Sequence, residues 1–147
     1  MKKLLMVGKI GCGKTTLSQR LLNEEVRYEK TQAIQVLGDD ILDTPGEYLE
    51  QKQFYHALIV TAVEADVILL LFAANDEQNM FSPRMNSMFG EKPVIGVITK
   101  TDLESDPSVL DGIEEILRMA GARRILRVGL GDDACIDALR KAIEEEK

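Results

Sequence analysis

The sequence is poor in several residue types, and each shortage excludes a class of protein. Its 147 residues include no tryptophan, one histidine and two cysteines, Cys12 and Cys135, which lie far apart. Two distant cysteines provide no disulfide framework, so a reducing cytoplasm is the expected compartment. Positive charge is also scarce. The net charge of −7 argues against nucleic acid or an anionic membrane as the main partner, because both select basic surfaces.

Long apolar runs are absent as well. The first run ends at Gly8 with no small-residue cleavage site after it, so it predicts a buried strand rather than a signal peptide. The longest later run, Val67–Ala74, is far too short to cross a bilayer.

His56, the single histidine, has no cysteine or carboxylate at a ligand spacing, which indicates an ordinary helix residue. The remaining composition, 45% hydrophobic and 29% charged, predicts one globular domain over residues 1–147.

Apolar runs of strand length alternate with amphipathic segments of helical period. Strands are expected over residues 3–7, 31–37, 40–43, 66–73, 92–99 and 124–128. Helices are expected over residues 16–22, 48–64, 82–89, 106–120 and 134–146. The turn signal Gly38-Asp39 makes the second and third strands a hairpin, the only antiparallel part expected. The predicted fold is a doubly wound α/β domain with a mostly parallel six-stranded sheet, helices on both faces, and ligands beyond the carboxyl ends of the strands.

The first chemical signal lies between the first strand and the first helix. Residues 8–15 fit the Walker A pattern G-x-x-x-x-G-K-[ST], in which backbone N–H groups and the following helix receive phosphates. Lys14 would reach the β- and γ-phosphates, and the Thr15 hydroxyl would bind Mg²⁺. The alternative is a chance match in a glycine-rich turn. The predicted nucleotide-binding residues here are Gly8, Lys9, Ile10, Gly11, Cys12, Gly13, Lys14, Thr15 and Thr16.

A second signal, Asp43-Thr-Pro-Gly46, follows another apolar strand and has the form D-x-x-G. A carboxylate at Asp43 would hold Mg²⁺, usually through water, because Mg²⁺ prefers oxygen ligands. Gly46 has no β-carbon, so its N–H group would approach a γ-phosphate closely. The alternative is an ordinary turn, where Asp, Pro and Gly are common.

A third signal, Thr99-Lys-Thr-Asp102, follows a buried strand and is similar to N-K-x-D, the guanine-reading motif. The Asp102 carboxylate would accept hydrogen bonds from N1–H and the 2-amino group of guanine, and the Lys100 stem would lie over the base or ribose. Thr99 stands where the pattern has Asn and offers a hydroxyl in place of an amide. The choice between guanine and adenine therefore stays open, and a merely polar loop is the alternative.

These three motifs, in this order on an α/β chain, resemble the Ras-like P-loop GTPases and imply a P-loop NTPase G domain. More closely, the first 103 residues resemble the EutP/PduV family, small proteins that accompany ethanolamine and propanediol utilisation and their bacterial microcompartments. The match is carried by residues 8–16, 30–33, 42–50 and 98–103. The run Asp-Thr-Pro-Gly-Glu-Tyr from Asp43 is the most specific part of it.

The resemblance implies roles for further residues. Thr31 would be the switch threonine, which binds Mg²⁺ and the γ-phosphate; an edge-strand threonine is the alternative. Glu47 stands where many GTPases carry a water-orienting Gln, which implies slow hydrolysis; a favourable acidic residue at a helix start is the alternative. Lys14, Thr31 and Glu47 are thus the candidate catalytic residues, and Thr15, Thr31 and Asp43 the Mg²⁺ ligands. Residues 128–132 would form the loop beside the base, without the usual Ser-Ala.

The resemblance leaves three functions open. The first is a GTP- and GDP-binding protein with slow Mg²⁺-dependent hydrolysis. The second is an ATP-dependent acetate kinase, a role linked to this family. The third is a nucleotide-binding interaction module of the microcompartment without significant turnover. Implied partners are shell proteins or proteins of the utilisation pathway, in the cytoplasm or at the microcompartment.

Overall fold

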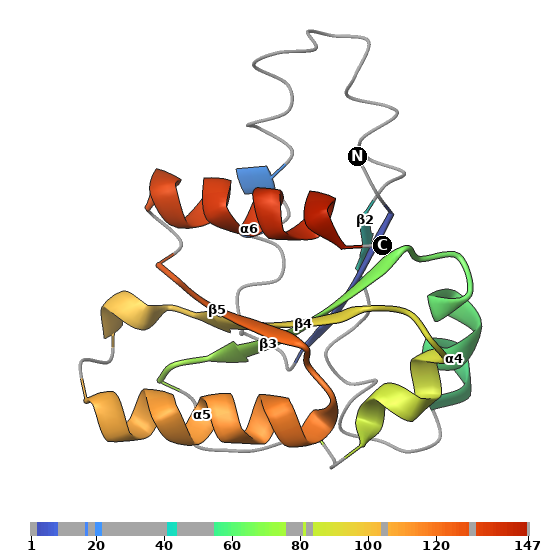
Figure 1. Ribbon diagram of the computed structural model, residues 1–147, viewed down its shortest axis with the longest axis horizontal. Helices are drawn as coiled ribbons and strands as arrows, with labels where there is room; N and C mark the ends of the chain where they lie inside the picture. The colour runs from blue at the N-terminus through green and yellow to red at the C-terminus, as the bar shows by residue number, and fades with distance from the viewer. Residues whose placement is uncertain are drawn as a thin grey trace, which may run out of the picture.

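A parallel β-sheet forms the centre of the computed structural model, which describes residues 3–8, 17, 20–21, 41–43, 55–75, 81, 84–103, 106–129 and 132–146. Its described strands are β1 (Leu4–Gly8), β2 (Ile41–Asp43), β3 (Val67–Ala73), β4 (Val94–Thr99) and β5 (Arg124–Val128). They lie in the order β2-β1-β3-β4-β5, and every neighbouring pair is parallel (Figure 1). The chain passes outward from β1 to β2 and then returns to the other side of β1. The order therefore reverses between β1 and β3, where doubly wound folds bind ligands.

The described strands number five, and the expected count of six is not confirmed. The segment expected to form the antiparallel edge, residues 31–37, lies outside the described residues. The strand expected next to it is present as β2, and it pairs with β1 through Leu4–Ile41 and Met6–Asp43.

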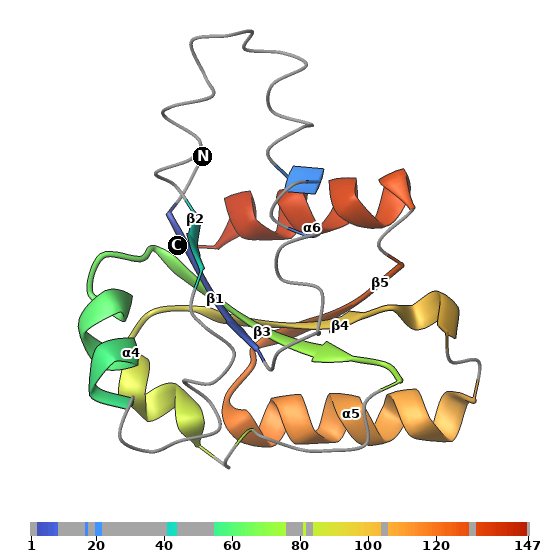
Figure 2. The same ribbon diagram turned by 180° about the vertical axis from the view of Figure 1, so that it is seen from behind.

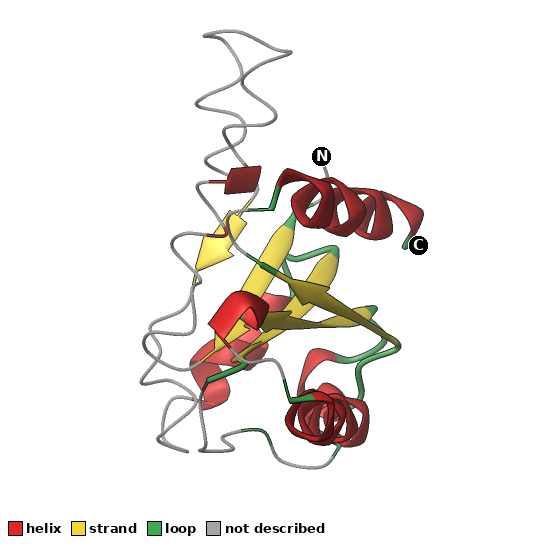
Figure 3. Ribbon diagram, turned by 90° about the vertical axis from the view of Figure 1, so that its left-hand side faces the viewer, coloured by secondary structure: helices red, strands yellow, loops and turns green. Residues whose placement is uncertain are grey.

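Helices cover both faces of the sheet (Figure 3). One face carries α4 (Tyr55–Ala62), the 3₁₀ helix η3 (Met85–Phe89) and α5 (Pro107–Ala120), and the other carries α6 (Asp133–Glu145). Strand residues alternate between the two layers: Leu5 and Val7 pack on the α5 side, whereas Leu4 and Met6 pack on the α6 side. Burial on both faces explains why β1, β3 and β4 are continuous apolar runs.

The predicted start and stop signals of α5 are confirmed. The carboxylate of Asp106 accepts a hydrogen bond from the Ser108 backbone N–H at 3.0 Å, and Pro107 opens the first turn. Gly121 ends the helix in the left-handed conformation, with φ of 112°, and its N–H donates to the Arg118 carbonyl at 3.0 Å. The helix expected over residues 134–146 is also confirmed, as α6.

The helix expected over residues 82–89 is confirmed for Met85–Phe89, which form the 3₁₀ helix η3. Arg84 before it adopts a left-handed backbone with φ of 60°. The Arg84 N–H donates to the carbonyl of Met119, at the end of α5, at 2.6 Å. Arg84 therefore lies outside the helix, and residues 82–83, where the helix was expected to begin, lie outside the described residues. Gly90, with φ of 66°, ends η3 as expected.

Candidate functional site

The carboxyl ends of β3, β4 and β5 lie level with one another. Thr99 at the end of β4 is in register with Ala73 of β3 and with Val128 of β5. The Ala74 N–H donates to the Thr99 carbonyl at 2.8 Å, so the pairing continues past the end of β3. The loops that follow β4 and β5, two of the segments singled out from the sequence, therefore leave the sheet side by side.

The loop after β4 turns sharply away from the strand. Thr99 is fully buried, with 0% of its surface exposed, so its hydroxyl is not accessible to a ligand in this conformation. Lys100 takes a left-handed backbone with φ of 57°, and the short 3₁₀ helix η4 (Thr101–Leu103) follows. Asp102 is exposed. The turn at Lys100 thus separates a buried threonine from an accessible carboxylate.

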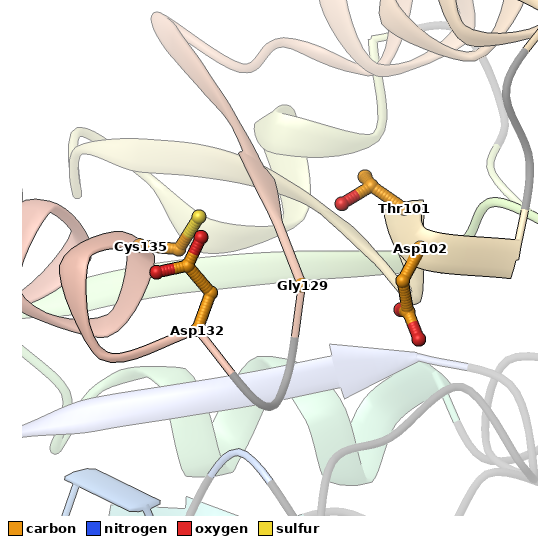
Figure 4. Close-up of a pocket in the computed structure, with 5 residues that line it drawn as sticks. All are labelled: Thr101, Asp102, Gly129, Asp132 and Cys135. Carbon is orange, nitrogen blue, oxygen red and sulfur yellow. The ribbon is translucent and has the colours of Figure 1, made fainter.

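A cavity of about 320 Å³ lies between the two loops. Figure 4 shows Thr101 and Asp102 on one side and Gly129, Asp132 and Cys135 on the other. Its lining offers two carboxylates, a hydroxyl and a thiol around a backbone stretch without a side chain. The volume is within the range of small-molecule sites, and a planar base with polar edges suits such a lining.

The β5 side of the cavity is fixed by the start of α6. Asp132 donates its backbone N–H to the Gly129 carbonyl at 2.9 Å, and its carboxylate accepts from the Ala134 N–H at 2.9 Å. Asp132 therefore caps α6, and one carboxylate oxygen is occupied by that role. Cys135, in the first turn of α6, is partly exposed and has a free thiol.

Sequence reasoning singled out Asp102 and the loop to Asp132, but it missed Thr101 and Cys135 as lining residues. Thr101 lies inside the Thr99–Asp102 motif, so the motif itself was a signal. Cys135 follows the helix cap by three residues, which places it one turn on and on the same side of the helix. The spacing of Asp132 and Cys135 therefore places Cys135 at the cavity only once Asp132 is known to line it.

The predicted phosphate side is described only where the strands end. Gly8 closes β1 in register with Leu71, and Asp43 closes β2 beside Met6. Both therefore lie at the same edge of the sheet as the cavity. The other predicted residues of this side lie outside the described residues: Lys9, Ile10, Gly11, Cys12, Gly13, Lys14, Thr15, Thr16, Thr31, Gly46 and Glu47.

Three structural findings concern metal binding and membrane insertion. Among the described residues, no three His, Cys, Asp or Glu side chains gather as metal ligands would. His56 lies exposed on α4, as expected. None of the helices that the structure describes has the length and apolarity needed to span a membrane.

Comparison with known proteins gives a family match over almost the whole chain. The PduV-EutP family model, described as ethanolamine utilisation and propanediol utilisation, matches residues 1–145. The chain is 39% identical over 139 residues to the propanediol utilization protein PduV of Citrobacter freundii, covering 95% of this chain and 91% of that protein. It is 38% identical over 103 residues to a Salmonella typhimurium protein named "Probable acetate kinase EutP", covering 70% of this chain and 65% of that protein.

Two more distant likenesses concern the fold. The chain is 29% identical over 159 residues to GTPase Era of Mycoplasmopsis pulmonis, of which it spans 54%. It superposes on translation elongation factor SelB of Methanococcus maripaludis with a TM-score of 0.57 and 18% identity, covering 99% of this chain and 34% of SelB. Together with the parallel sheet between helical layers, these likenesses confirm the expected P-loop G-domain fold.

Proposed function

Because this chain belongs to the PduV-EutP family, which is linked to ethanolamine and propanediol utilisation, we propose that it binds a guanine nucleotide and hydrolyses GTP slowly with Mg²⁺. The observation that carries the proposal is the cavity between Asp102 and Asp132, at the sheet edge where β1 enters the Walker A sequence. Residues 1–147 would act as a single G domain.

The base would enter the cavity. Asp102 is exposed, so its two carboxylate oxygens are available to N1–H and the 2-amino group of guanine. Adenine presents a donor and an acceptor in other places and would leave this carboxylate unpaired. Gly129 leaves room for the base to approach the backbone, and the Lys100 stem would cover the base or ribose. Thr99, which is buried, would support the loop from behind.

The phosphates would bind the Walker A residues, with Lys14 at the β- and γ-phosphates. Thr15, Thr31 and Asp43 would hold Mg²⁺. All three supply oxygen atoms, the ligand type that Mg²⁺ prefers, so the donor set fits this ion. Bound Mg²⁺ neutralises charge that develops on the phosphates during transfer. The N–H group of Gly46 would approach the γ-phosphate.

Hydrolysis would be slow because Glu47 stands where a glutamine orients water in related GTPases. A carboxylate can accept a hydrogen bond from the attacking water, but it cannot donate one to the γ-phosphate. It also adds negative charge beside an anion. The result would be a protein that spends long periods in its triphosphate-bound state.

Calorimetric titration of nucleotide-free protein with GDP, GTP, ADP and ATP in the presence of Mg²⁺ tests the proposal. Guanine nucleotides should bind more tightly, and equal affinity for ATP and GTP would reject guanine selectivity. Phosphate release should be slow in the wild type and absent from Lys14→Ala. Lys141→Ala is a matched control, since Lys141 is an exposed lysine of α6.

The similarity to a protein named "Probable acetate kinase EutP" supports a second candidate, an ATP-dependent acetate kinase. The γ-phosphoryl group of ATP would pass to a carboxylate oxygen of acetate, giving ADP and acetyl phosphate. ADP formation that requires acetate and disappears in Lys14→Ala would favour this activity. ADP formation independent of acetate would exclude it.

The family link also supports a role as an interaction module in the cytoplasm or at a microcompartment, with shell or pathway proteins as partners. In that case nucleotide binding would matter and turnover would not. A variant that binds nucleotide without hydrolysing it should then still support microcompartment assembly.

A further inference from the structure

The helical residues that follow the Walker A sequence are attached to the start of α6. Leu17, Arg20 and Leu21 are helical, and Arg20 lies five positions after Thr15. Figure 2 shows residues 20–21 beside α6. A guanidinium nitrogen, Nη2 of Arg20, forms an ion pair with the carboxylate of Asp133 in the first turn of α6.

Apolar contacts and a second arginine complete this attachment. Leu17 and Leu21 are fully buried and belong to the same core cluster as Ile136 and Ile143 of α6. Arg140 donates from Nη2 to the Leu21 carbonyl at 2.8 Å. Asp133, Ile136, Arg140 and Ile143 recur at helical spacing, so they form one stripe along α6. The contact with α6 thus combines buried apolar side chains with two polar interactions, one made by Asp133 and one by Arg140.

Asp133 lies next to residues that line the cavity. Asp133 directly follows Asp132, which lines the cavity and caps α6, and Cys135 of the same turn also lines it. The Arg20–Asp133 pair therefore links Arg20 to the helical turn that carries the β5 side of the cavity.

We infer that Arg20 is a positioning residue that holds the first turn of α6, and with it Asp132 and Cys135, in place at the cavity; this rests on the proposed nucleotide binding. The base of a nucleoside diphosphate would enter that cavity, whereas inorganic pyrophosphate has no base. Binding of the nucleoside diphosphate therefore depends on the placement of the cavity lining, and binding of pyrophosphate does not. Loss of the Arg20–Asp133 pair therefore lowers the affinity for the nucleotide more than the affinity for pyrophosphate.

The surroundings of the pair allow this effect to be separated from loss of stability. The Arg20 side chain is 25% exposed and the Asp133 side chain 65% exposed. Nε of Arg20 is buried with no hydrogen-bond partner among the described residues. Arg20→Met removes that buried polar atom and keeps an apolar stem, and the Asp133 carboxylate is already largely exposed to water. Neither change creates a buried unpaired charge, which is the costly outcome of breaking an ion pair.

Titrations of the wild type, Arg20→Met and Asp133→Asn with GDP and with inorganic pyrophosphate, both with Mg²⁺, test the inference. The ratio of the pyrophosphate Kd to the GDP Kd should fall about tenfold in each variant, an ordinary size for coupling between two sites. The melting temperature should change by less than about 4 °C. Asp133→Asn alters an exposed side chain, so it stays informative if Arg20→Met folds poorly.

Two controls make the result specific. Arg118→Met removes an arginine from an exposed ion pair with Glu114 on α5, away from the cavity, and should leave the ratio unchanged. Arg20→Glu should lower the ratio, and the exchange Arg20→Glu with Asp133→Arg should restore part of it.

The outcomes separate this inference from the proposed function. An unchanged ratio, or equal losses of GDP and pyrophosphate affinity together with a lower melting temperature, would overturn the positioning role while leaving nucleotide binding intact. A wild type that binds GDP no better than pyrophosphate would overturn the proposed base site, and the inference with it.

Discussion

A β-carbon built on Gly129 would lie 3.7 Å from Oγ1 of Thr101, an ordinary van der Waals distance, so the loops after β4 and β5 approach each other closely at the cavity. A methyl group therefore fits on Gly129, whereas a longer side chain would extend into the cavity that this residue lines. Gly129→Ala should therefore retain GDP binding. Gly129→Leu should weaken it about tenfold or more by filling the base cavity, since a drop of 1.4 kcal/mol in binding free energy already has that effect.

Fluorescence titration with a labelled GDP would measure both Gly129 variants. Inorganic pyrophosphate serves as the internal control, because its affinity should be the same in Gly129→Leu and in the wild type. Unaltered GDP affinity in Gly129→Leu would mean that the base binds elsewhere.

Gly121, at the end of α5, should tolerate no side chain. Its φ of 112° is unfavourable for other residues, and a β-carbon there would lie 2.1 Å from Cγ of Asn86. Gly121→Ala should lower the free energy of unfolding by about 2 kcal/mol or more, from backbone strain and the clash together. Urea denaturation measures this loss.

Gly112 provides the matched control for that measurement. It lies within α5, and nothing stands within 4 Å of a β-carbon added to it. Gly112→Ala should therefore raise the free energy of unfolding by about 0.5–1 kcal/mol, because alanine loses less backbone entropy in a helix. Equal effects of the two substitutions would contradict the environments described for these glycines.

The elements that sequence reasoning predicted well are those whose signals are local. Asp106, Pro107 and Gly121 are each recognisable beside the helix that they begin or end, and α5 forms between them. β3 and β4 were predicted from runs of apolar residues, because strands buried on both faces need no polar alternation. The Thr99–Asp102 and Val128–Asp132 segments were predicted to lie at strand ends because each directly follows a predicted strand.

What sequence reasoning missed depends on contacts between distant segments. Arg84 became left-handed because its N–H group bonds to Met119 of α5, a partner that no local pattern announces. Thr101 and Cys135 share a cavity only because the register of β4 and β5 brings their loops together. The Arg20–Asp133 pair joins positions 113 residues apart and has no sequence signature.

The cap of α5 predicts a dependence of stability on pH. The pKa of Asp106 lies below its ordinary value because the Ser108 hydroxyl, and then the Ser108 backbone N–H, donate to the carboxylate. A lowered folded-state pKa adds stability above the unfolded-state pKa of 3.8, and that stability is lost as the pH falls through the lowered value. Asp106→Ala should therefore melt below the wild type at neutral pH, and the two should converge in strong acid.

Thermal melts across the acid range would measure that convergence. Ser108→Ala keeps the backbone donor and removes the hydroxyl, so its melting temperature at neutral pH should lie between those of the wild type and Asp106→Ala. A difference between wild type and Asp106→Ala that stays constant down to strong acid would show that the ionised carboxylate is not the source of the stability.

Asp102→Asn should change which base the protein prefers. The carboxylate accepts hydrogen bonds from two donors on guanine, whereas an amide presents one acceptor and one donor, which match the carbonyl and N–H groups of xanthine. Hydrogen bonds to charged groups are worth about 1.5–3 kcal/mol, so GDP affinity should fall at least tenfold. Xanthosine diphosphate affinity should rise with the same substitution.

Competitive titration of both nucleotides measures this change in preference. Asp137→Asn, which alters an exposed residue of α6, controls for loss of a surface charge. If Asp102→Asn lowered affinity for both nucleotides equally, Asp102 would act on folding of the loop and not on the base.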